Sequence, residues 1–243
     1  MTSIGFQLYS LHDVDDPLPA VIERVGGAGF DGVELAGVDG HDPEAVADAL
    51  TAADLDVAGA HVGLDEIEED PENVVETYRT LDCEDVVVPW LDPEHFETLD
   101  SVEAVAERLD AAAIDLGEHD VAVHYHNHDQ EFTDLDGEPA LSTLVAATEG
   151  VGFELDLGWV GAAGYDPLTV LEENAHRVSI VHLKDYDAET GEVVEVGDGD
   201  LDIAAAIDAV RDHDCDWLVY EAEERPDSYG TLDHAVDVVE TYW

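Results

Sequence analysis

Lys184 is the only lysine in this chain, and it lies beside a histidine at the end of an apolar run. Residues 178–181 are mostly apolar and β-branched, and His182, Lys184 and Asp185 come soon after them. The chain contains 62 acidic residues and 7 basic ones, so surface lysines are almost entirely absent. Burying a charged group costs free energy unless the group is paired. A lysine retained at the end of an expected buried strand therefore indicates a function for Lys184.

Three polar residues that end apolar runs form a set that could bind a metal ion. They are Asp156, His182 and Glu221. Two carboxylate oxygens and one imidazole nitrogen suit Mn²⁺, Mg²⁺, Co²⁺ or Zn²⁺. We therefore expect one divalent metal ion as the cofactor.

A fourth metal ligand is expected from residues 123–131, which contain three histidines. His124, His126 and His128 occupy every second position, and such residues face the same side of an extended strand. One or two of them could instead form hydrogen bonds with the neighbouring carboxylates. In either case this segment should lie beside the three residues above.

Eight apolar, β-branched runs supply the strands that must position these residues. The runs begin near residues 4, 31, 56, 85, 120, 151, 178 and 216, at intervals of 25 to 38 residues, and a segment with helical spacing follows each one. Asp-Pro pairs at 42–43, 70–71 and 166–167 predict the starts of three helices. Eight such units predict a single (β/α)8 TIM barrel, one domain over residues 1–243. A doubly wound open sheet is the alternative, but the first βα turn lacks its GxGxxG fingerprint.

The active site of such a barrel lies at the C-terminal ends of the strands. The residue that closes each apolar run is therefore a candidate for the site. In chain order these candidates are Gln7 or Tyr9, Glu34, His61, Trp90, His126, Asp156, His182 with Lys184, and Glu221. A single one could be a core histidine or a helix cap, but their concentration at one end of one barrel favours an active site.

The composition predicts an acidic but globular protein. Hydrophobic residues make up 45% of the chain, which is enough to bury a core despite the net charge of -55 and the pI near 4.1. This charge favours a salt-adapted cytoplasmic protein, because the Debye length falls to about 3 Å in 1 M salt. A nucleic-acid partner is disfavoured, because phosphate binding requires the Lys and Arg residues that this chain lacks.

The sequence indicates neither a disulfide framework nor a membrane segment. Cys83 and Cys215 are far apart and belong to no CxxC motif. The first residues contain no basic leader region, and no apolar run approaches ~18 residues. We therefore expect a soluble, intracellular protein without a membrane partner.

Several motifs resemble the xylose isomerase-like TIM-barrel superfamily of sugar phosphate isomerases and epimerases. The resemblance extends from the first strand to the last helix. Its most specific motifs are Tyr-His-Asn-His at 125–128 with Glu131, Glu-Leu-Asp at 154–156 with Trp159, His-Leu-Lys-Asp at 182–185, and Tyr-Glu at 220–221. The resemblance implies a small sugar or cyclitol as the substrate. Because related barrels often dimerise, a homodimer is also an open possibility.

The resemblance also implies a set of metal ligands. In relatives the ligands are a strand 5 glutamate, a strand 6 aspartate, a strand 7 histidine and a strand 8 glutamate. The last three correspond to Asp156, His182 and Glu221. The strand 5 position holds His126 here, and Glu131 lies five residues further on. His126 is therefore the expected fourth ligand, with Glu131 as the alternative.

The mechanism that the resemblance implies is removal of the proton α to a carbonyl group, giving an enediolate. The metal ion would act as the Lewis acid, and a carboxylate would take the proton. Glu131 is the expected base and Glu221 the second carboxylate. Lys184 would donate to a substrate oxygen or stabilise its developing negative charge.

Four further residues are expected to contact the substrate. Glu34, His61 and His128 would bind its hydroxyl groups, and Trp159 would offer an apolar face to its carbon skeleton. Trp159 could instead be a packed anchor of its loop.

Isomerisation or epimerisation of a sugar, sugar phosphate or cyclitol is the function that the resemblance favours. A dehydratase of a keto-cyclitol and a non-catalytic sugar-binding barrel are the alternatives. A DNA-repair endonuclease of the same superfamily is disfavoured by the net charge of -55. Lys184 and Arg225 are the only lysine or arginine residues near the expected mouth, which favours an uncharged substrate over a phosphate ester.

Overall fold

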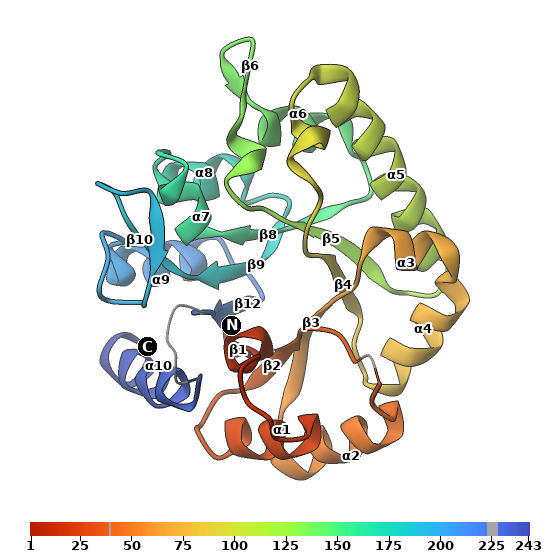
Figure 1. The fold of residues 1–243 in the computed structure, drawn as a ribbon, viewed down its shortest axis with the longest axis vertical. Coiled ribbons are helices and arrows are strands. Elements are labelled where there is room, and N and C mark those ends of the chain that lie inside the picture. Colours follow the sequence, from red (N-terminus) through yellow and green to blue (C-terminus); the bar gives the residue numbers. More distant parts are fainter. Residues whose placement is uncertain (39, 223–227) are drawn as a thin grey trace.

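Eight parallel strands close into a barrel in the computed structural model of the protein (Figure 1). The structure describes residues 1–38, 40–222 and 228–243. Each strand pairs with the barrel strands before and after it in the chain, and the last pairs with the first. The barrel strands are β1 (Ser3–Gln7), β2 (Gly32–Leu35), β3 (Asp56–His61), β4 (Asp85–Val88), β5 (Ala122–His126), β8 (Gly152–Asp156), β9 (Val178–Leu183) and β12 (Trp217–Tyr220). The predicted (β/α)8 TIM barrel is therefore confirmed.

Helices surround the barrel on its outside (Figure 1). Among the described residues the α-helices are α1 (Leu18–Gly26), α2 (Pro43–Ala53), α3 (Leu64–Glu69), α4 (Pro71–Thr80), α5 (Leu99–Gly117), α6 (Ala140–Ala147), α7 (Leu157–Ala162), α8 (Pro167–Asn174), α9 (Ile203–Asp212) and α10 (Ser228–Tyr242). Short 3₁₀ helices are η1 (Leu8–Leu11), η2 (Pro93–Phe96) and η3 (Gln130–Phe132). Two antiparallel hairpins lie in the loops: β6 (Asp134–Leu135) with β7 (Glu138–Pro139), and β10 (Asp185–Asp187) with β11 (Glu192–Val194).

Local sequence signals explain where helices begin. Asp42, Asp70 and Asp166 each accept a backbone N–H from the first turn of the helix that follows, and each precedes a proline whose missing N–H costs nothing at that position. The three helix starts predicted from Asp-Pro pairs are therefore confirmed. None of the described helices has the length and apolar character needed to cross a membrane.

At four places an aspartate in the left-handed backbone conformation joins the end of a helix to the next strand. Asp54, Asp82, Asp120 and Asp214 have φ angles of 56°, 56°, 62° and 53°. Aspartate visits this conformation more readily than most residues other than glycine, because its short side chain can form local hydrogen bonds. These turns set the point at which the four strands that follow them enter the barrel.

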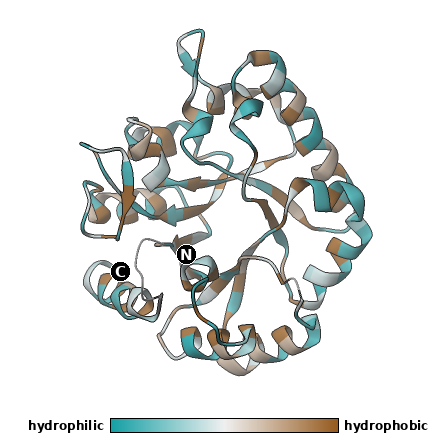
Figure 2. Cartoon of the chain, in the orientation of Figure 1, coloured by the Kyte–Doolittle hydropathy of each residue, from teal (hydrophilic) through white to brown (hydrophobic). Residues whose placement is uncertain are grey.

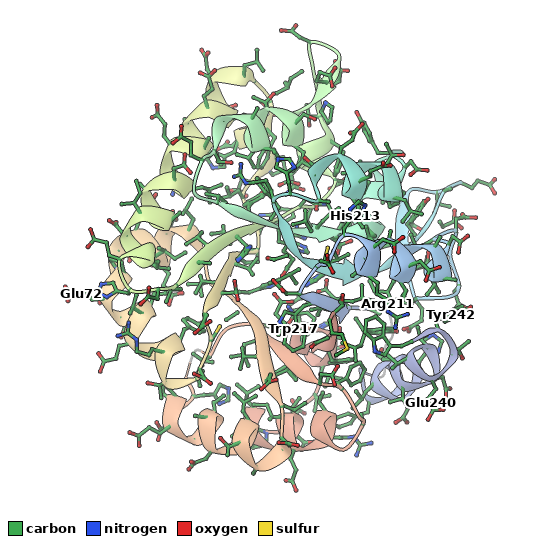
Figure 3. The ribbon with its side chains drawn as sticks, turned by 180° about the vertical axis from the view of Figure 1, so that it is seen from behind. Glu72, Arg211, His213, Trp217, Glu240 and Tyr242 are labelled. Atoms are coloured by element: carbon green, nitrogen blue, oxygen red, sulfur yellow. The ribbon has the colours of Figure 1, made fainter. Side chains whose placement is uncertain are left out.

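The interior of the barrel is apolar at one level and charged at the next. Ala58, Val87, Ile180 and Val219 form a buried cluster packed against Trp217, which lies near the middle of the molecule in Figure 3. A larger apolar core lies between the barrel and the helices. Hydrophobic and hydrophilic residues alternate along these helices (Figure 2). The apolar cluster forms a floor beneath the charged side chains of the site.

One buried carboxylate organises the loop after β9. The Asp185 side chain accepts backbone N–H bonds from Gly197 (2.9 Å), Gly199 (3.1 Å) and Leu201 (2.9 Å), and it is wholly buried. A carboxylate that accepts several N–H bonds in a dry site forms charge-assisted bonds stronger than neutral ones. Because Lys184 immediately precedes Asp185, this interaction also holds the backbone of the candidate site.

We expect Asp185→Asn to lower the free energy of unfolding by about 3 kcal/mol. The amide would replace an accepting oxygen with an NH₂ group that faces the N–H donors of Gly197 and Gly199. Urea unfolding followed by circular dichroism measures the loss. Asp187→Asn is the matched control, because Asp187 also accepts backbone N–H bonds but lies near the surface. Equal losses in the two variants would contradict the role assigned to Asp185.

Candidate metal centre and substrate pocket

The four residues predicted as metal ligands lie together at the mouth of the barrel. Asp156 ends β8, His182 lies in β9 opposite Asp156, Glu221 follows β12, and His126 ends β5. One ligand atom from each residue can be chosen so that all four atoms lie within 4.8 Å of one another. All four side chains are buried. Parallel strands bring their C-terminal ends to the same rim, which is why residues so distant in sequence meet here.

An unsatisfied carboxylate oxygen lies at the centre of this group. Asp156 Oδ1 accepts the backbone N–H of Trp159 at 2.8 Å, while Asp156 Oδ2 is buried without a hydrogen-bond partner. Oδ2 lies 3.9 Å from His126 Nε2 and 3.8 Å from His182 Nδ1. These distances are too long for hydrogen bonds but suit two ligands that each lie about 2 Å from one shared ion. The donor set therefore fits a divalent cation.

Lys184 lies against the same carboxylates. Its Nζ is 3.1 Å from Glu221 Oε2 and 3.8 Å from Asp156 Oδ2, and its side chain is 1% exposed. Burial alone would raise the pKa of Glu221, but Lys184 and His182 hold that pKa well below its usual range. Glu221 is therefore an ionised carboxylate beside the candidate ion.

Glycine at position 158 allows helix α7 to pass directly over Lys184. A Cβ atom added at Gly158 would lie 2.7 Å from Lys184 Cγ and 2.9 Å from its backbone carbonyl carbon. Separations this short do not occur between packed atoms. The small residue therefore sets the distance between the start of α7 and the lysine.

A second buried layer of charged side chains supports the first. Glu154 Oε1 lies 2.8 Å from His126 Nδ1, 3.1 Å from His61 Nε2 and 3.1 Å from His182 Nε2. Glu34 contributes Oε2 at 2.6 Å from His182 Nε2 and Oε1 at 3.0 Å from His61 Nε2. Burial opposes the charged imidazolium, but Glu34 and Glu154 raise the pKa of His61 to about 10. The same carboxylates and Glu221 hold the pKa of His182 well above its usual range, although burial opposes them.

Glu154 is a site residue that sequence reasoning missed. It lies two positions before Asp156, so strand alternation places both side chains on the inner face of β8. This alternation is the sequence signal that could have identified Glu154 as a site residue. Asn127 was missed as well: its side chain accepts the Asp156 N–H at 3.0 Å and donates to the Asp156 carbonyl at 3.4 Å, which fixes the backbone of the aspartate.

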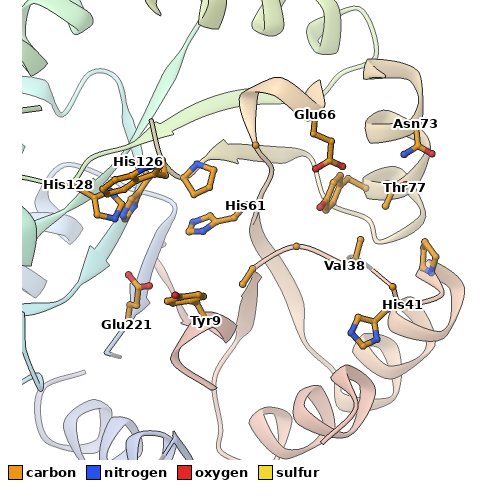
Figure 4. Close-up of a pocket in the computed structure, with 18 of the residues that line it drawn as sticks. Tyr9, Val38, His41, His61, Glu66, Asn73, Thr77, His126, His128 and Glu221 are labelled. Carbon is orange, nitrogen blue, oxygen red and sulfur yellow. The ribbon is translucent and has the colours of Figure 1, made fainter. Parts of the chain in front are cut away.

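A pocket of about 740 Å³ opens above the four candidate ligands. His61, His126, His128, Lys184 and Glu221 line its inner part, together with Trp90 and Trp159. The pocket continues toward α2, α3 and α4, where His41, Glu66, Asn73 and Thr77 line it (Figure 4). Among the described lining residues Lys184 is the only lysine or arginine.

Three of the four predicted substrate contacts line this pocket, and Glu34 does not. His61, His128 and Trp159 belong to its wall. Glu34 is wholly buried in the supporting layer, where it contacts His61 and His182. Its carboxylate is thus engaged with two histidines of the protein.

His128 presents a neutral imidazole to the pocket. Burial lowers the pKa of His128 to about 2, and the positive charges of His126 and Lys184 add to this effect. Its ring packs edge-on against the ring of Trp90, with 4.6 Å between the ring centroids. The centroid of the Trp159 ring lies 5.3 Å from that of His128. His128 Nδ1 is buried without a hydrogen-bond partner. His128 therefore offers an unsatisfied polar atom between two aromatic rings.

The third alternating histidine of β5, His124, lies outside the group. Its Nε2 lies 2.7 Å from Asp85 Oδ1, and its Nδ1 lies 3.4 Å from Ser179 Oγ. His124 is one full strand repeat below His126, so it reaches a different level of the barrel. Of the two alternatives for these histidines, hydrogen bonding to a neighbouring carboxylate is the one that describes His124.

Glu131 lies outside the pocket wall. It belongs to η3, it is wholly buried, and both of its carboxylate oxygens are engaged. The Tyr125 hydroxyl donates to Oε1, and the His128 backbone N–H donates to Oε2 at 2.7 Å. In the structure the Glu131 carboxylate therefore contacts Tyr125 and the His128 backbone, and its role as the base stays a prediction. The short helix after β5 turns its carboxylate toward Tyr125, where it fixes the backbone of His128.

Comparisons with known proteins identify similar chains. The family model described as "Xylose isomerase-like TIM barrel" matches residues 22–241. Inosose dehydratase from Clostridium tetani (strain Massachusetts / E88) is 26% identical to this chain over 139 residues. The match covers 49% of this chain and 46% of that protein, so it spans about half the length of the curated relative.

Solved structures share the whole fold. A sugar phosphate isomerase/epimerase from Parabacteroides distasonis ATCC 8503 has a TM-score of 0.85 at 19% identity, covering 99% of this chain and 97% of that one. The 3-keto-D-glucoside 4-epimerase from E. coli has a TM-score of 0.73 at 18% identity, covering 99% and 100%. At these identities the likeness concerns the fold.

Glu131→Gln should become more stable relative to the wild type as pH rises from about 4.5 to above 7. Burial raises the pKa of Glu131 to about 7 from its ordinary value of 4.5, although the bonds from Tyr125 and His128 oppose this. A carboxyl group with a raised folded-state pKa stabilises the folded state below the unfolded-state pKa, and this contribution is lost as pH rises through the folded-state value. The neutral amide does not titrate, so the variant keeps its free energy of unfolding over this pH range. The change in stability relative to the wild type should therefore reach about 3 kcal/mol.

Urea unfolding of both proteins at about pH 4.5 and about pH 8.5 measures this difference. Glu173→Gln, at an exposed position, should show the same offset from the wild type at both pH values. An offset for Glu131→Gln that does not change with pH would show that the Glu131 carboxyl group titrates normally.

Proposed function

We propose a function from one premise: this chain belongs to the xylose isomerase-like TIM barrel family. Enzymes of this family include isomerases, epimerases and dehydratases, and this chain carries a buried group of His, Asp and Glu residues of the kind that holds a metal ion. We infer that it is a divalent-metal-dependent isomerase or epimerase of a sugar or cyclitol. The observation that supports this most is the unpartnered Asp156 Oδ2, which faces two histidine nitrogens at the base of a pocket.

We assign the metal ligands to His126, Asp156, His182 and Glu221. A divalent ion held there would supply a Lewis acid for a substrate carbonyl group. The residues themselves orient its ligand atoms: Asn127 holds the backbone of Asp156, and Asp156 caps helix α7 with its other oxygen. A ligand held at both its backbone and its side chain keeps its position when the substrate binds.

We assign proton transfer to Glu221 and charge stabilisation to Lys184. Glu221 lines the pocket as an ionised carboxylate, so it can accept the proton α to the carbonyl. Lys184 Nζ lies 3.1 Å from that carboxylate, where it can donate to the substrate oxygen that becomes negative. Glu131, the base expected from the sequence, becomes a positioning residue for His128.

We assign substrate binding to the pocket wall. His61 and His128 offer polar ring atoms to hydroxyl groups, while Trp159 and Trp90 offer apolar faces to the carbon skeleton. Among the described residues of the wall, Lys184 is the only lysine or arginine, and it is already paired with Glu221, while His61 is paired with Glu34 and Glu154; Arg225 lies outside the described residues. An uncharged polyol is therefore the substrate class that this pocket favours.

Dehydration of a keto-cyclitol is the second candidate reaction. The partial match to an inosose dehydratase supports it. The same α-proton removal, followed by loss of a β-hydroxyl, would give dehydration instead of epimerisation. We further propose that residues 1–243 form one cytoplasmic domain suited to concentrated salt, in which a net charge of -55 is screened.

We expect the purified protein to bind about one Mn²⁺ per chain, and Asp156→Asn to weaken this binding at least about 100-fold. The substitution removes the charged oxygen that faces both histidines. Isothermal titration calorimetry in high salt gives the affinity, and elemental analysis after dialysis gives the stoichiometry. Glu195→Gln is the matched control, because Glu195 is a buried carboxylate that accepts from Tyr220 outside the group. Unchanged affinity in Asp156→Asn would refute the ligand assignment.

The reaction class is tested by proton exchange. We expect the metal-loaded enzyme, incubated in D₂O with a panel of ketoses and inososes, to place deuterium on the carbon α to the carbonyl, as seen by NMR. Lys184→Ala and the better-packed Lys184→Met should both retain the metal and exchange about 10²-fold more slowly or worse. Wild-type exchange rates in both variants would refute the role of Lys184. No exchange with any substrate would favour the non-catalytic sugar-binding barrel.

A further inference from the structure

We propose that the pocket has two parts and that its substrate is a glycoside, a sugar or cyclitol that carries a second, uncharged sugar ring. The reacting ring would lie in the inner part, beside the four candidate ligands. The second ring would lie in an outer part, which is lined by His41, Glu66, Asn73 and Thr77. This inference rests on the proposed function for the reacting ring, and its test measures binding alone.

The pocket is larger than one sugar ring requires. Its volume of about 740 Å³ lies in the range of roughly 300–1,000 Å³ that encloses a drug-sized ligand, and a single hexose is much smaller than such a ligand. Figure 4 shows His41, Asn73 and Thr77 across the pocket from His126 and Glu221. A ring bound at the inner part therefore leaves the outer part available for a further group.

The order of the strands around the barrel explains why the pocket extends in this direction. The candidate ligands end or follow β5, β8, β9 and β12, which are neighbours in the barrel. The outer part is built from the segments after the neighbouring strands β2 and β3: His41 precedes α2, Glu66 belongs to α3, and Asn73 and Thr77 belong to α4. The two parts of the pocket therefore use different halves of the barrel rim.

The outer part offers groups that match sugar hydroxyls. The Asn73 amide and the Thr77 hydroxyl can each donate and accept hydrogen bonds, as a sugar hydroxyl does. Within the described residues neither side chain has a hydrogen-bond partner, whereas Thr80 of the same helix donates to the Glu76 carbonyl at 2.9 Å. The described side chains of the outer part include neither lysine nor arginine. An uncharged polyhydroxylated group therefore fits this part better than an anionic one.

Two exposed aromatic side chains flank the outer part. Tyr9 follows β1 and Trp90 follows β4, so they lie on either side of the segments after β2 and β3. Both line the pocket, and they are 44% and 46% exposed. Tyr9 stacks on His12, with 4.8 Å between the ring centroids, and Trp90 meets His128 edge-on. An aromatic face that is held in place and open to solvent is suited to pack against the apolar C–H face of a sugar ring.

Paired ligands test the second-ring site. D-fructose is compared with the glucosyl-fructoses turanose, leucrose and palatinose, and myo-inositol with its galactoside galactinol, by isothermal titration calorimetry of the wild-type protein with Mn²⁺ present. We expect at least one glycoside to bind about 10-fold more tightly than its parent ring, because one added hydrogen bond and one added aromatic contact together account for about that factor. If every glycoside binds no more tightly than its parent, the proposal is overturned.

A bulky substitution locates the second ring. Asn73→Trp would fill the outer part, so it should remove the gain of the glycoside and leave the affinity for the parent ring unchanged. Glu72→Trp is the matched control, because Glu72 is the neighbouring exposed residue of α4 and lies at the outer edge of the molecule in Figure 3. A gain that survives Asn73→Trp would overturn the location, and so would an equal loss of parent ring and glycoside.

The second-ring site and the proposed reaction fail in different ways. The titrations need no turnover, so they can be interpreted even if no deuterium exchange occurs. Exchange with a parent ring, together with equal binding of parent and glycosides, would support the reaction and refute the second-ring site. A gain in affinity that Asn73→Trp removes, in a protein that exchanges no substrate, would support the second-ring site and refute the reaction.

Discussion

Mutual neutralisation of buried charges is the constraint on which the centre of this barrel depends. Carboxylates and bases that meet there are Glu34, Glu154, Asp156 and Glu221 on one side, and His61, His126, His182 and Lys184 on the other. Each of these ions would cost several kcal/mol to bury alone. Together they form a network in which nearly every charge has an opposite partner within about 3 Å. Glu34 Oε1, Glu154 Oε2 and Asp156 Oδ2 are buried there without a hydrogen-bond partner. Asp156 Oδ2 has its nearest basic nitrogens at 3.8 to 3.9 Å, so a cation bound by the four candidate ligands would satisfy it.

The surrounding structure holds the charged side chains of this network in position. Strand alternation places Glu154 and Asp156 at successive levels of one strand, and the parallel pairing of β8 with β9 sets His182 opposite Asp156. The loops then close the site: Asp185 binds the glycine-rich loop beside Lys184, and Gly158 lets α7 approach that lysine. A change in any of these supports would shift a charge by a fraction of an ångström, which a dry, low-dielectric site tolerates poorly.

The fold and the meeting of the four candidate ligands could be predicted because both depend on local signals. An Asp-Pro pair such as Asp42-Pro43 specifies a helix start without reference to the rest of the chain, and an ionisable residue such as His182 at the end of an apolar run specifies the rim. The supporting layer depends on which side chains meet across the barrel: Glu154 contacts residues of β3, β5 and β9. Glu131 shows the other limit, because the turn after β5 decides whether its carboxylate points toward the pocket or toward Tyr125.

Under the proposed function, discrimination against charged substrates would come from the pocket and not from the acidic surface. At about 1 M salt the surface charge is screened beyond about 3 Å, so it neither repels a distant phosphate nor attracts a distant cation. Inside the pocket the screening is weak, and Lys184 is already within 3.1 Å of Glu221. A phosphate group placed there would lie beside an ionised carboxylate and would have to compete with it for the lysine. An uncharged polyol meets no such competition, and its hydroxyl groups can bond to unsatisfied atoms such as His128 Nδ1.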